Sequence, residues 1–147
     1  MLFEWVAGQG DLVSLKLMSK LKHYSKQVLS DALIEASYNG HTETVKWLLD
    51  EGADPKADDY TALILACRGN HFEIVQWLVY RGASVNGLYG EPLLSACFGG
   101  YYDIVKYLVE NGADISVNDY GPKRIAKQQG HRFITYFFDS IEHIRYM

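Results

Sequence analysis

The chain has 147 residues, of which 48% are hydrophobic and 14% aromatic, and its formal net charge is −4. That length suits one domain with a buried core, and the hydrophobic content excludes an intrinsically disordered chain. The acidic balance argues against general nucleic-acid binding, and no stretch approaches the roughly 18 apolar residues of a membrane span. The first residues, MLFEWVAGQGD, lack the basic segment and apolar run of a secretory signal, so we expect a soluble intracellular protein.

Charge is distributed unevenly along the chain. Acidic side chains outnumber basic ones by 14 to 5 between Asp31 and Asp119, whereas basic ones are in excess in residues 1–30 and 120–147. An acidic middle therefore lies between mildly basic ends, and it predicts a partner with a basic patch.

An internal repeat of 30 residues organises the chain. Residues 1–30 are a divergent first unit, in which Gly10 matches Gly40. Three segments then align without gaps: ALIEASYNGHTETVKWLLDEGAD from Ala32, ALILACRGNHFEIVQWLVYRGAS from Ala62 and PLLSACFGGYYDIVKYLVENGAD from Pro92. A divergent last unit, residues 121–147, keeps four matching positions: Pro122, Ala126, Gly130 and His131. Agreement at a fixed period predicts stacked repeats, and end units differ because each has one neighbour only.

Each full unit predicts two short antiparallel helices and a loop. In the middle unit, the apolar spacing predicts a first helix over about 62–68 and a second over about 72–81. Gly69 and Asn70 break the two helices, and Gly82 ends the second, because these residue types tolerate a left-handed backbone. Such short helices are unstable alone, so stacking must stabilise them. The pattern predicts an all-α solenoid of about three full repeats and two divergent capping repeats.

The elements T-A-L-x-L-A and G-H-x-x-x-V-x-W-L-L-x-x-G-A-D resemble the ankyrin repeat, whose pattern opens T-P-L-H-x-A. The resemblance implies a right-handed solenoid with first helices and loop tips on a concave face, and a single ankyrin-repeat domain over residues 1–147. Its parts would be an N-terminal cap repeat (1–30), full repeats (31–60, 61–90 and 91–120) and a C-terminal cap repeat (121–147).

Two departures from the ankyrin pattern matter. The period is 30 rather than 33 residues, and the missing residues fall in the inter-repeat loop, so the projecting β-hairpin should be stunted. The family's His, which braces that loop, is replaced by Ile34, Ile64, Leu94 and Arg124. Short units of this style are similar to ankyrin arrays of giant, mimivirus-like viruses of amoebae, and ankyrin effectors of intracellular bacteria are a second candidate source.

Residue types that could carry chemistry recur at fixed repeat positions, which favours structural roles. Cys67 and Cys97 lie one unit apart, too far for a disulfide, and are interpreted as reduced packing residues. His41, His71 and His131 share the position after the helix break and do not converge on one metal ion. An aromatic ladder down the second helices is interpreted as packing between repeats: Trp47, Trp77, Tyr107 and Phe137. No nucleophile–base constellation or glycine-rich phosphate loop is found in the sequence, so we predict no enzymatic activity, cofactor or metal.

Second helices also carry charged pairs at i, i+3, namely Glu43 with Lys46 and Asp103 with Lys106. Such pairs are worth about 0.2–0.5 kcal/mol and predict a solvated outer face.

Binding residues should be those that vary while the scaffold repeats. Two positions near the end of each first helix vary in this way, as do the loop tips. The predicted protein-binding residues are Tyr38, Asn39, Asp58, Asp59, Tyr60, Arg68, Leu88, Tyr89, Phe98, Asn118, Asp119 and Tyr120. Aromatic residues and Arg are the usual anchors of protein interfaces, although the tip tyrosines could instead cover the next unit's helix. Arg68 is the sharpest candidate, because the repeat pattern requires no cation there.

The sequence thus predicts a monomeric, cytoplasmic module that binds a partner protein, in the host cytoplasm for a viral or bacterial effector. The alternative is self-assembly through the apolar end segments MLFEWV and RFITYFFDSIEHI. Nucleic-acid binding by the small Lys and Arg clusters near the ends is disfavoured, because the acidic middle would repel phosphates. The segment LVYRGASVN also resembles an asparaginyl hydroxylase site with Asn86 as acceptor, although Ser84 replaces the usual acidic residue.

Overall fold

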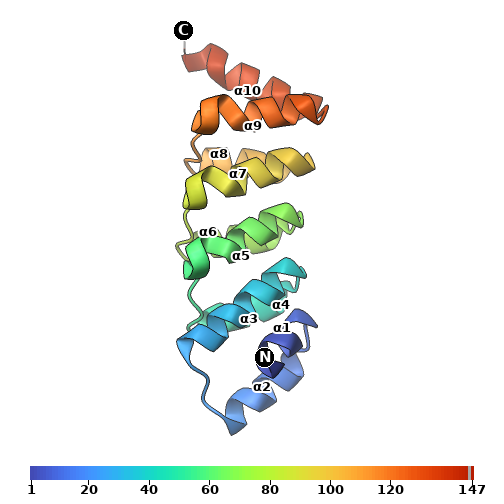
Figure 1. Ribbon diagram of the computed structural model, residues 1–147, viewed down its shortest axis with the longest axis vertical. Coiled ribbons are helices and arrows are strands. Elements are labelled where there is room, and N and C mark those ends of the chain that lie inside the picture. The colour runs from blue at the N-terminus through green and yellow to red at the C-terminus, as the bar shows by residue number, and fades with distance from the viewer. Residues whose placement is uncertain (146) are drawn as a thin grey trace. The chain divides into compact units, whose positions relative to one another are not determined.

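Ten helices and no strand make up the described part of the chain, residues 1–145 and 147, in a computed structural model (Figure 1). The chain divides into two compact units, Met1–Ser84 and Val85–Met147. The first unit contains α1 (Leu2–Gly8), α2 (Leu12–Leu21), α3 (Lys26–Tyr38), α4 (Thr42–Asp50), α5 (Ala57–Arg68) and α6 (Phe72–Tyr80). The second contains α7 (Gly87–Gly99), α8 (Tyr102–Glu110), α9 (Val117–Gln128) and α10 (Arg132–Arg145).

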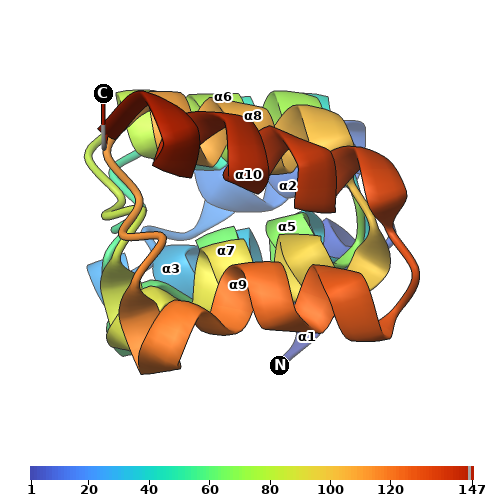
Figure 2. The ribbon, with the colours of Figure 1, turned by 90° about the horizontal axis from the view of Figure 1, so that it is seen from above.

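Within each unit, the odd-numbered helices form one layer and the even-numbered helices form the other (Figure 2). In the first unit α3 packs on α1, α4 and α5, and in the second unit α9 packs on α7 and α10. Alanines at the same repeat position, Ala36 and Ala66 in the first unit and Ala96 and Ala126 in the second, are fully buried. Side chains this small let neighbouring helices approach closely. The predicted all-α stack of helix pairs is confirmed within both units.

A residue with a left-handed backbone separates the two helices of each repeat. Gly40 has φ 78° and Asn70 has φ 59° in the first unit, and Gly100 has φ 76° in the second. The second helix of each repeat starts two residues after this break. The predicted helix boundaries of the middle repeat are confirmed at the break and at the second helix to within a residue, because glycine and asparagine mark the stop locally.

The first helix of the first full repeat is longer than the repeat pattern predicted. It begins at Lys26, where the Ser25 hydroxyl accepts a hydrogen bond from the Val28 N–H at 3.4 Å. Lys26 also pairs with Asp54 at 2.9 Å. Residues 28–30 are therefore helical, whereas the corresponding residues of the later repeats are not.

The loops between repeats contain a left-handed turn and, in the described residues, no β-hairpin. Three consecutive residues have positive φ at the start of α5, α7 and α9, namely residues 58–60, 88–90 and 118–120. A single turn of opposite hand thus replaces the hairpin, and the predicted stunting of this loop is confirmed.

The outer face of the second helices carries charged side chains, as predicted. Lys46 pairs with Glu43 at 2.8 Å and with Glu73 of the next repeat at 2.8 Å, and its ammonium lies 5.3 Å from the centre of the Trp77 ring. One lysine thus links two consecutive repeats.

The predicted pair of Asp103 with Lys106 is wrong, since Lys106 lies 3.9 Å from Glu110 instead. In α4 the carboxylate equivalent to Glu110 is Asp50, which already forms an ion pair with the Arg81 guanidinium at 2.8 Å. In α8 that carboxylate is available, so the lysine turns toward it. No helix within residues 1–145 combines the length and the apolarity needed to cross a bilayer.

Candidate functional site

Histidines tie three of the repeats to the one before, while the third full repeat has Tyr101 at that position. The Nε2 atom of His41 lies 2.9 Å from the carbonyl oxygen of Gly8, and that of His71 lies 3.1 Å from the carbonyl of Tyr38. His131 makes the same contact with Phe98 at 3.0 Å. Each histidine must donate here, because a carbonyl oxygen only accepts. The predicted structural role of these histidines is confirmed, and residues 1–145 contain no cluster of three or more His, Cys, Asp or Glu arranged for a metal ion.

This ladder positions two of the predicted binding residues. The carbonyls of Tyr38 and Phe98 are held by histidines, while their side chains are 58% and 63% exposed. Tyr38 ends α3, and Phe98 lies at the same point in α7. A fixed backbone with an exposed aromatic side chain limits the entropy lost on binding.

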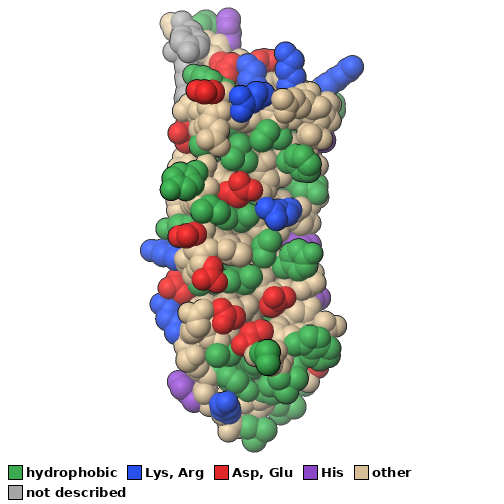
Figure 3. Space-filling model, viewed as in Figure 1, with side chains coloured by type: hydrophobic (Ala, Val, Ile, Leu, Met, Phe, Trp, Pro, Cys, Tyr) green, Lys and Arg blue, Asp and Glu red, His purple; other side chains and the backbone are tan. Residues whose placement is uncertain are grey.

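In the first unit, the ends of α3 and α5 bring three predicted residues to one edge. Tyr38, Asn39 and Arg68 are exposed at the C-terminal ends of these two neighbouring helices. The Asn39 side chain donates to the carbonyl of Glu35 at 2.9 Å, which fixes its amide. The face of the odd-numbered helices in this unit carries acidic side chains among hydrophobic ones (Figure 3).

The loop tip of the first unit lies at the opposite end of α5. Asp58 and Asp59 are both exposed, and Tyr60 is half-buried. The helix rises about 10 Å between Thr61 and Arg68, so the structure does not bring the tip and the helix ends into one cluster. Burial of part of the Tyr60 ring agrees with the alternative that tip tyrosines cover a neighbouring helix.

In the second unit, the predicted residues are also found at the surface. Tyr89 is 83% exposed, and Leu88 and Phe98 are exposed on the same helix, α7. The tip of α9 exposes Asn118, Asp119 and Tyr120.

Left-handed backbone makes these tips energetically costly. Asp58, Asp59 and Tyr60 have φ of 47°, 53° and 67°. Asp tolerates this region, but a tyrosine there carries a cost of about 1–2 kcal/mol. Strain of this kind concentrates at functional positions, which gives the tips a second reason for interest besides their exposure.

Sequence reasoning missed a surface hollow of about 450 Å³ on the first unit, lined by Met1, Glu4, Trp5, Asp31 and Glu35. Burial opposes ionisation of Glu4, but hydrogen bonding and the charge of the terminal amino group outweigh it, so the pKa of this carboxyl is lowered. Asp31 and Glu35 are like charges at i, i+4, an unfavourable pairing that the sequence alone already contains.

The cysteines and the aromatic ladder serve packing. Cys67 and Cys97 are unpaired and fully buried, and burial raises the pKa of both thiols, that of Cys97 to about 12. Trp77 is covered by Lys46, and Phe137 meets Tyr102 edge-on with ring centres 5.7 Å apart. These contacts join consecutive repeats, as predicted.

Comparison with known families agrees with this architecture. A family described as ankyrin repeats (3 copies) matches residues 4–88 and 33–119, well over half of the chain. The chain belongs to the ankyrin repeat family. Ankyrin repeats are generally protein–protein interaction modules and are typically non-catalytic. Among curated proteins, no significant match to this ankyrin repeat protein is found.

Proposed function

We propose that this ankyrin repeat protein binds a partner protein through the ends of its first helices and its loop tips, on the concave face of the repeats. One observation carries the proposal: positions that vary between repeats are exposed at the helix ends, whereas the alanines that recur are fully buried. Tyr38, Phe98 and Tyr89 present large apolar surfaces of the kind that anchor interfaces.

Site-specific photo-cross-linking tests this assignment before the partner has been identified. A benzophenone side chain is placed at Tyr38, Tyr89 or Phe98, and at Tyr80 as the control. Tyr80 is an exposed aromatic residue on the second helix α6. We expect cross-linked partner from the first three positions and little from Tyr80. Cross-linking mainly from Tyr80 would contradict the proposal.

The partner's chemistry follows from the charge of the tips, and we propose that it carries a basic patch. Asp58, Asp59 and Asp119 are carboxylates that solvent reaches. Replacing all three with asparagine should weaken binding and flatten its salt dependence, because exposed charges act mainly through long-range attraction. Identical affinity of the parent and triple variant from low to high salt would remove this part of the proposal.

We also propose that the protein acts in the cytoplasm, as a viral or bacterial effector in a host cell. The similarity of its short repeats to such proteins supports this, as do two buried, unpaired thiols, which suit a reducing compartment. Fractionation of infected cells with a specific antibody tests it, and recovery of the protein outside the cytosol would contradict it.

Self-assembly is the second candidate, and one observation favours it. Five apolar side chains of α1 and α2 are exposed: Leu2, Trp5, Val13, Leu17 and Leu21. Light scattering over a range of concentrations distinguishes self-assembly from a monomeric binding module. Self-assembly predicts a mean mass that rises with protein concentration, and a Leu17→Lys/Leu21→Lys variant should stay monomeric. A constant monomer mass would remove it.

A further inference from the structure

The last helix, α10, carries aromatic side chains where the earlier second helices carry charged or polar ones. Phe133 stands at the position of Glu43, Glu73 and Asp103, and Tyr136 stands at the position of Lys46, Gln76 and Lys106. Phe133 is 84% exposed and Tyr136 is 75% exposed. Since the earlier repeats carry polar side chains at these positions, two exposed aromatic rings here call for a reason other than stability.

These two rings belong to a larger aromatic patch, defined as Tyr102, Phe133, Tyr136 and Phe137. The patch lines a hollow of about 390 Å³ together with Ser140. It lies on α8 and α10, which form the layer away from the first helices of this unit (Figure 2).

Part of the patch is fixed by packing. Phe137 meets Tyr102 edge-on and also contacts the buried ring of Phe138, with ring centres 5.9 Å apart. These contacts hold the floor of the hollow in place. Phe133 and Tyr136 remain as exposed walls, an arrangement suited to receiving an apolar side chain.

The rim of the patch is basic. Two adjoining hollows, of about 320 and 310 Å³, share Arg132, and the first also includes Lys127 and one carboxylate, that of Asp139. Lys and Arg side chains gather at this end of the second unit (Figure 3). Neither Arg132 nor Lys127 forms an ion pair within the described residues.

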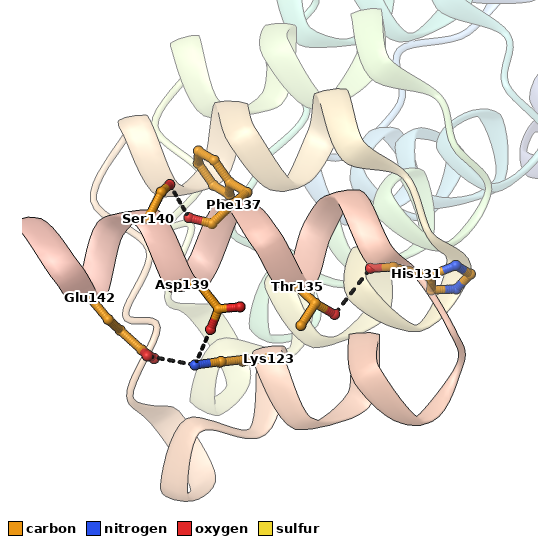
Figure 4. A network of polar contacts seen from close by, with 7 residues as sticks. All are labelled: Lys123, His131, Thr135, Phe137, Asp139, Ser140 and Glu142. Carbon is orange, nitrogen blue, oxygen red and sulfur yellow. Dashed lines mark hydrogen bonds and ion pairs between the residues drawn. The ribbon is translucent and has the colours of Figure 1, made fainter.

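The carboxylates of α10 offset only part of this positive charge. Lys123 lies 2.7 Å from Asp139 and 2.6 Å from Glu142 and holds both (Figure 4). Lys123 with its two carboxylates carries a net charge of −1, so Arg132 and Lys127 leave a net of +1 here. This excess favours an external acidic group over a basic one.

We propose that the aromatic patch is a second protein-binding surface, separate from the first-helix ends and loop tips, and that its occupant is an acidic amphipathic segment of a partner protein. An apolar side chain of the segment fills the hollow between Phe133 and Tyr136, and its carboxylates face Arg132 and Lys127. A second copy of this chain fits less well, because a symmetric contact would bring two basic rims together.

A fluorescent helical peptide tests the proposal, with Leu and Phe at i, i+3, i+4 and i+7 and Asp or Glu elsewhere. A second peptide has Lys in place of every acidic residue. The protein variant is Phe133→Asp/Tyr136→Lys, which recreates the Asp103 and Lys106 of α8 and should therefore keep its helix. We expect the acidic peptide to bind saturably and at least tenfold tighter than the basic one, and the variant to bind it about tenfold more weakly.

The matched control is Tyr38→Ala/Phe98→Ala, which changes only the first-helix ends. This control should bind the acidic peptide as the parent does, so failure here is distinguishable from failure of the proposed function. Three outcomes would overturn the proposal: no saturable binding of the acidic peptide, equal binding of both peptides, or unchanged affinity in the Phe133→Asp/Tyr136→Lys variant. Dimerisation that this variant abolishes, without peptide binding, would identify a second copy as the occupant and overturn it too.

Discussion

Replacing Gly40 with alanine would test the helix break that sets the end of α3. Gly40 has φ 78°, and an added Cβ would lie 2.5 Å from Cε1 of His71. That imidazole donates to the carbonyl of Tyr38 across 3.1 Å. Alanine therefore introduces left-handed strain and also displaces the ring that fixes the end of α3.

The expected loss of stability is the sum of these two contributions. A left-handed backbone costs a residue with a Cβ about 1–2 kcal/mol, and loss of the hydrogen bond from His71 costs about 0.5–1.5 kcal/mol. We expect the free energy of unfolding to fall by about 2–3 kcal/mol, equivalent to roughly 6–10 °C in Tm for a chain of this size. Gly52 is the matched control, since its φ is 101° and an added Cβ would meet nothing within 4 Å. Gly52→Ala should therefore lower the free energy of unfolding by the backbone strain alone.

Urea denaturation followed by circular dichroism measures both substitutions, and a double-mutant cycle with His71→Ala isolates the contact. In the His71→Ala background, Gly40→Ala should lower the free energy of unfolding by less than in the parent, with a coupling energy of about 1 kcal/mol. If Gly40→Ala costs no more than Gly52→Ala and is additive with His71→Ala, the steric argument is refuted.

Three further predictions follow from individual contacts. Lys123→Ala should speed hydrogen exchange in the C-terminal half of α10 by leaving Asp139 without its partner, and the effect should fade in high salt because the ion pair is partly exposed. Because burial raises the pKa of both thiols, that of Cys97 from 9.0 to about 12, stability should fall as pH rises from 9 to 12, and Cys67 and Cys97 should react with a thiol reagent only after denaturation. Asp59→Gly should raise the urea midpoint only slightly, by about 0.5 kcal/mol in unfolding free energy, since glycine relieves left-handed strain that Asp already tolerates. Unchanged exchange, rapid native labelling or a lowered midpoint, respectively, would contradict them.

The helix pairs were predictable because their signals are local and repeated. Glycine or asparagine stands at every helix break, and three aligned copies fix the period. The start of α3 was missed for a physical reason: Ser25 caps a helix that the repeat pattern had divided between two units. Because Ser25 caps a helix that starts at Lys26, residues 28–30 continue that helix and do not form the left-handed turn of the later repeats.

The candidate surface was only partly predictable. Variation between repeats correctly indicated exposed positions such as Tyr38 and Phe98, because residues that vary are not needed for stacking. The carbonyls that anchor them were not predictable, since each histidine's partner lies 33 residues earlier and is a backbone atom. The hollow beside Trp5 was likewise hidden, because it joins side chains of α1 and α3 that no repeat position relates.

The two ends of a first helix hold the proposed binding residues in opposite ways. At its C-terminal end, a histidine fixes the carbonyl of Tyr38 or Phe98, so an exposed ring is presented without backbone freedom. At its N-terminal tip, residues such as Tyr60 occupy left-handed conformations that glycine would adopt at lower cost. The second full repeat has Gly90 at that position, where a Cβ would lie 3.0 Å from Val117. Glycine is therefore compatible with the turn, and the retention of tyrosine at the other two tips is better explained by contacts that its side chain makes than by the folding of the loop.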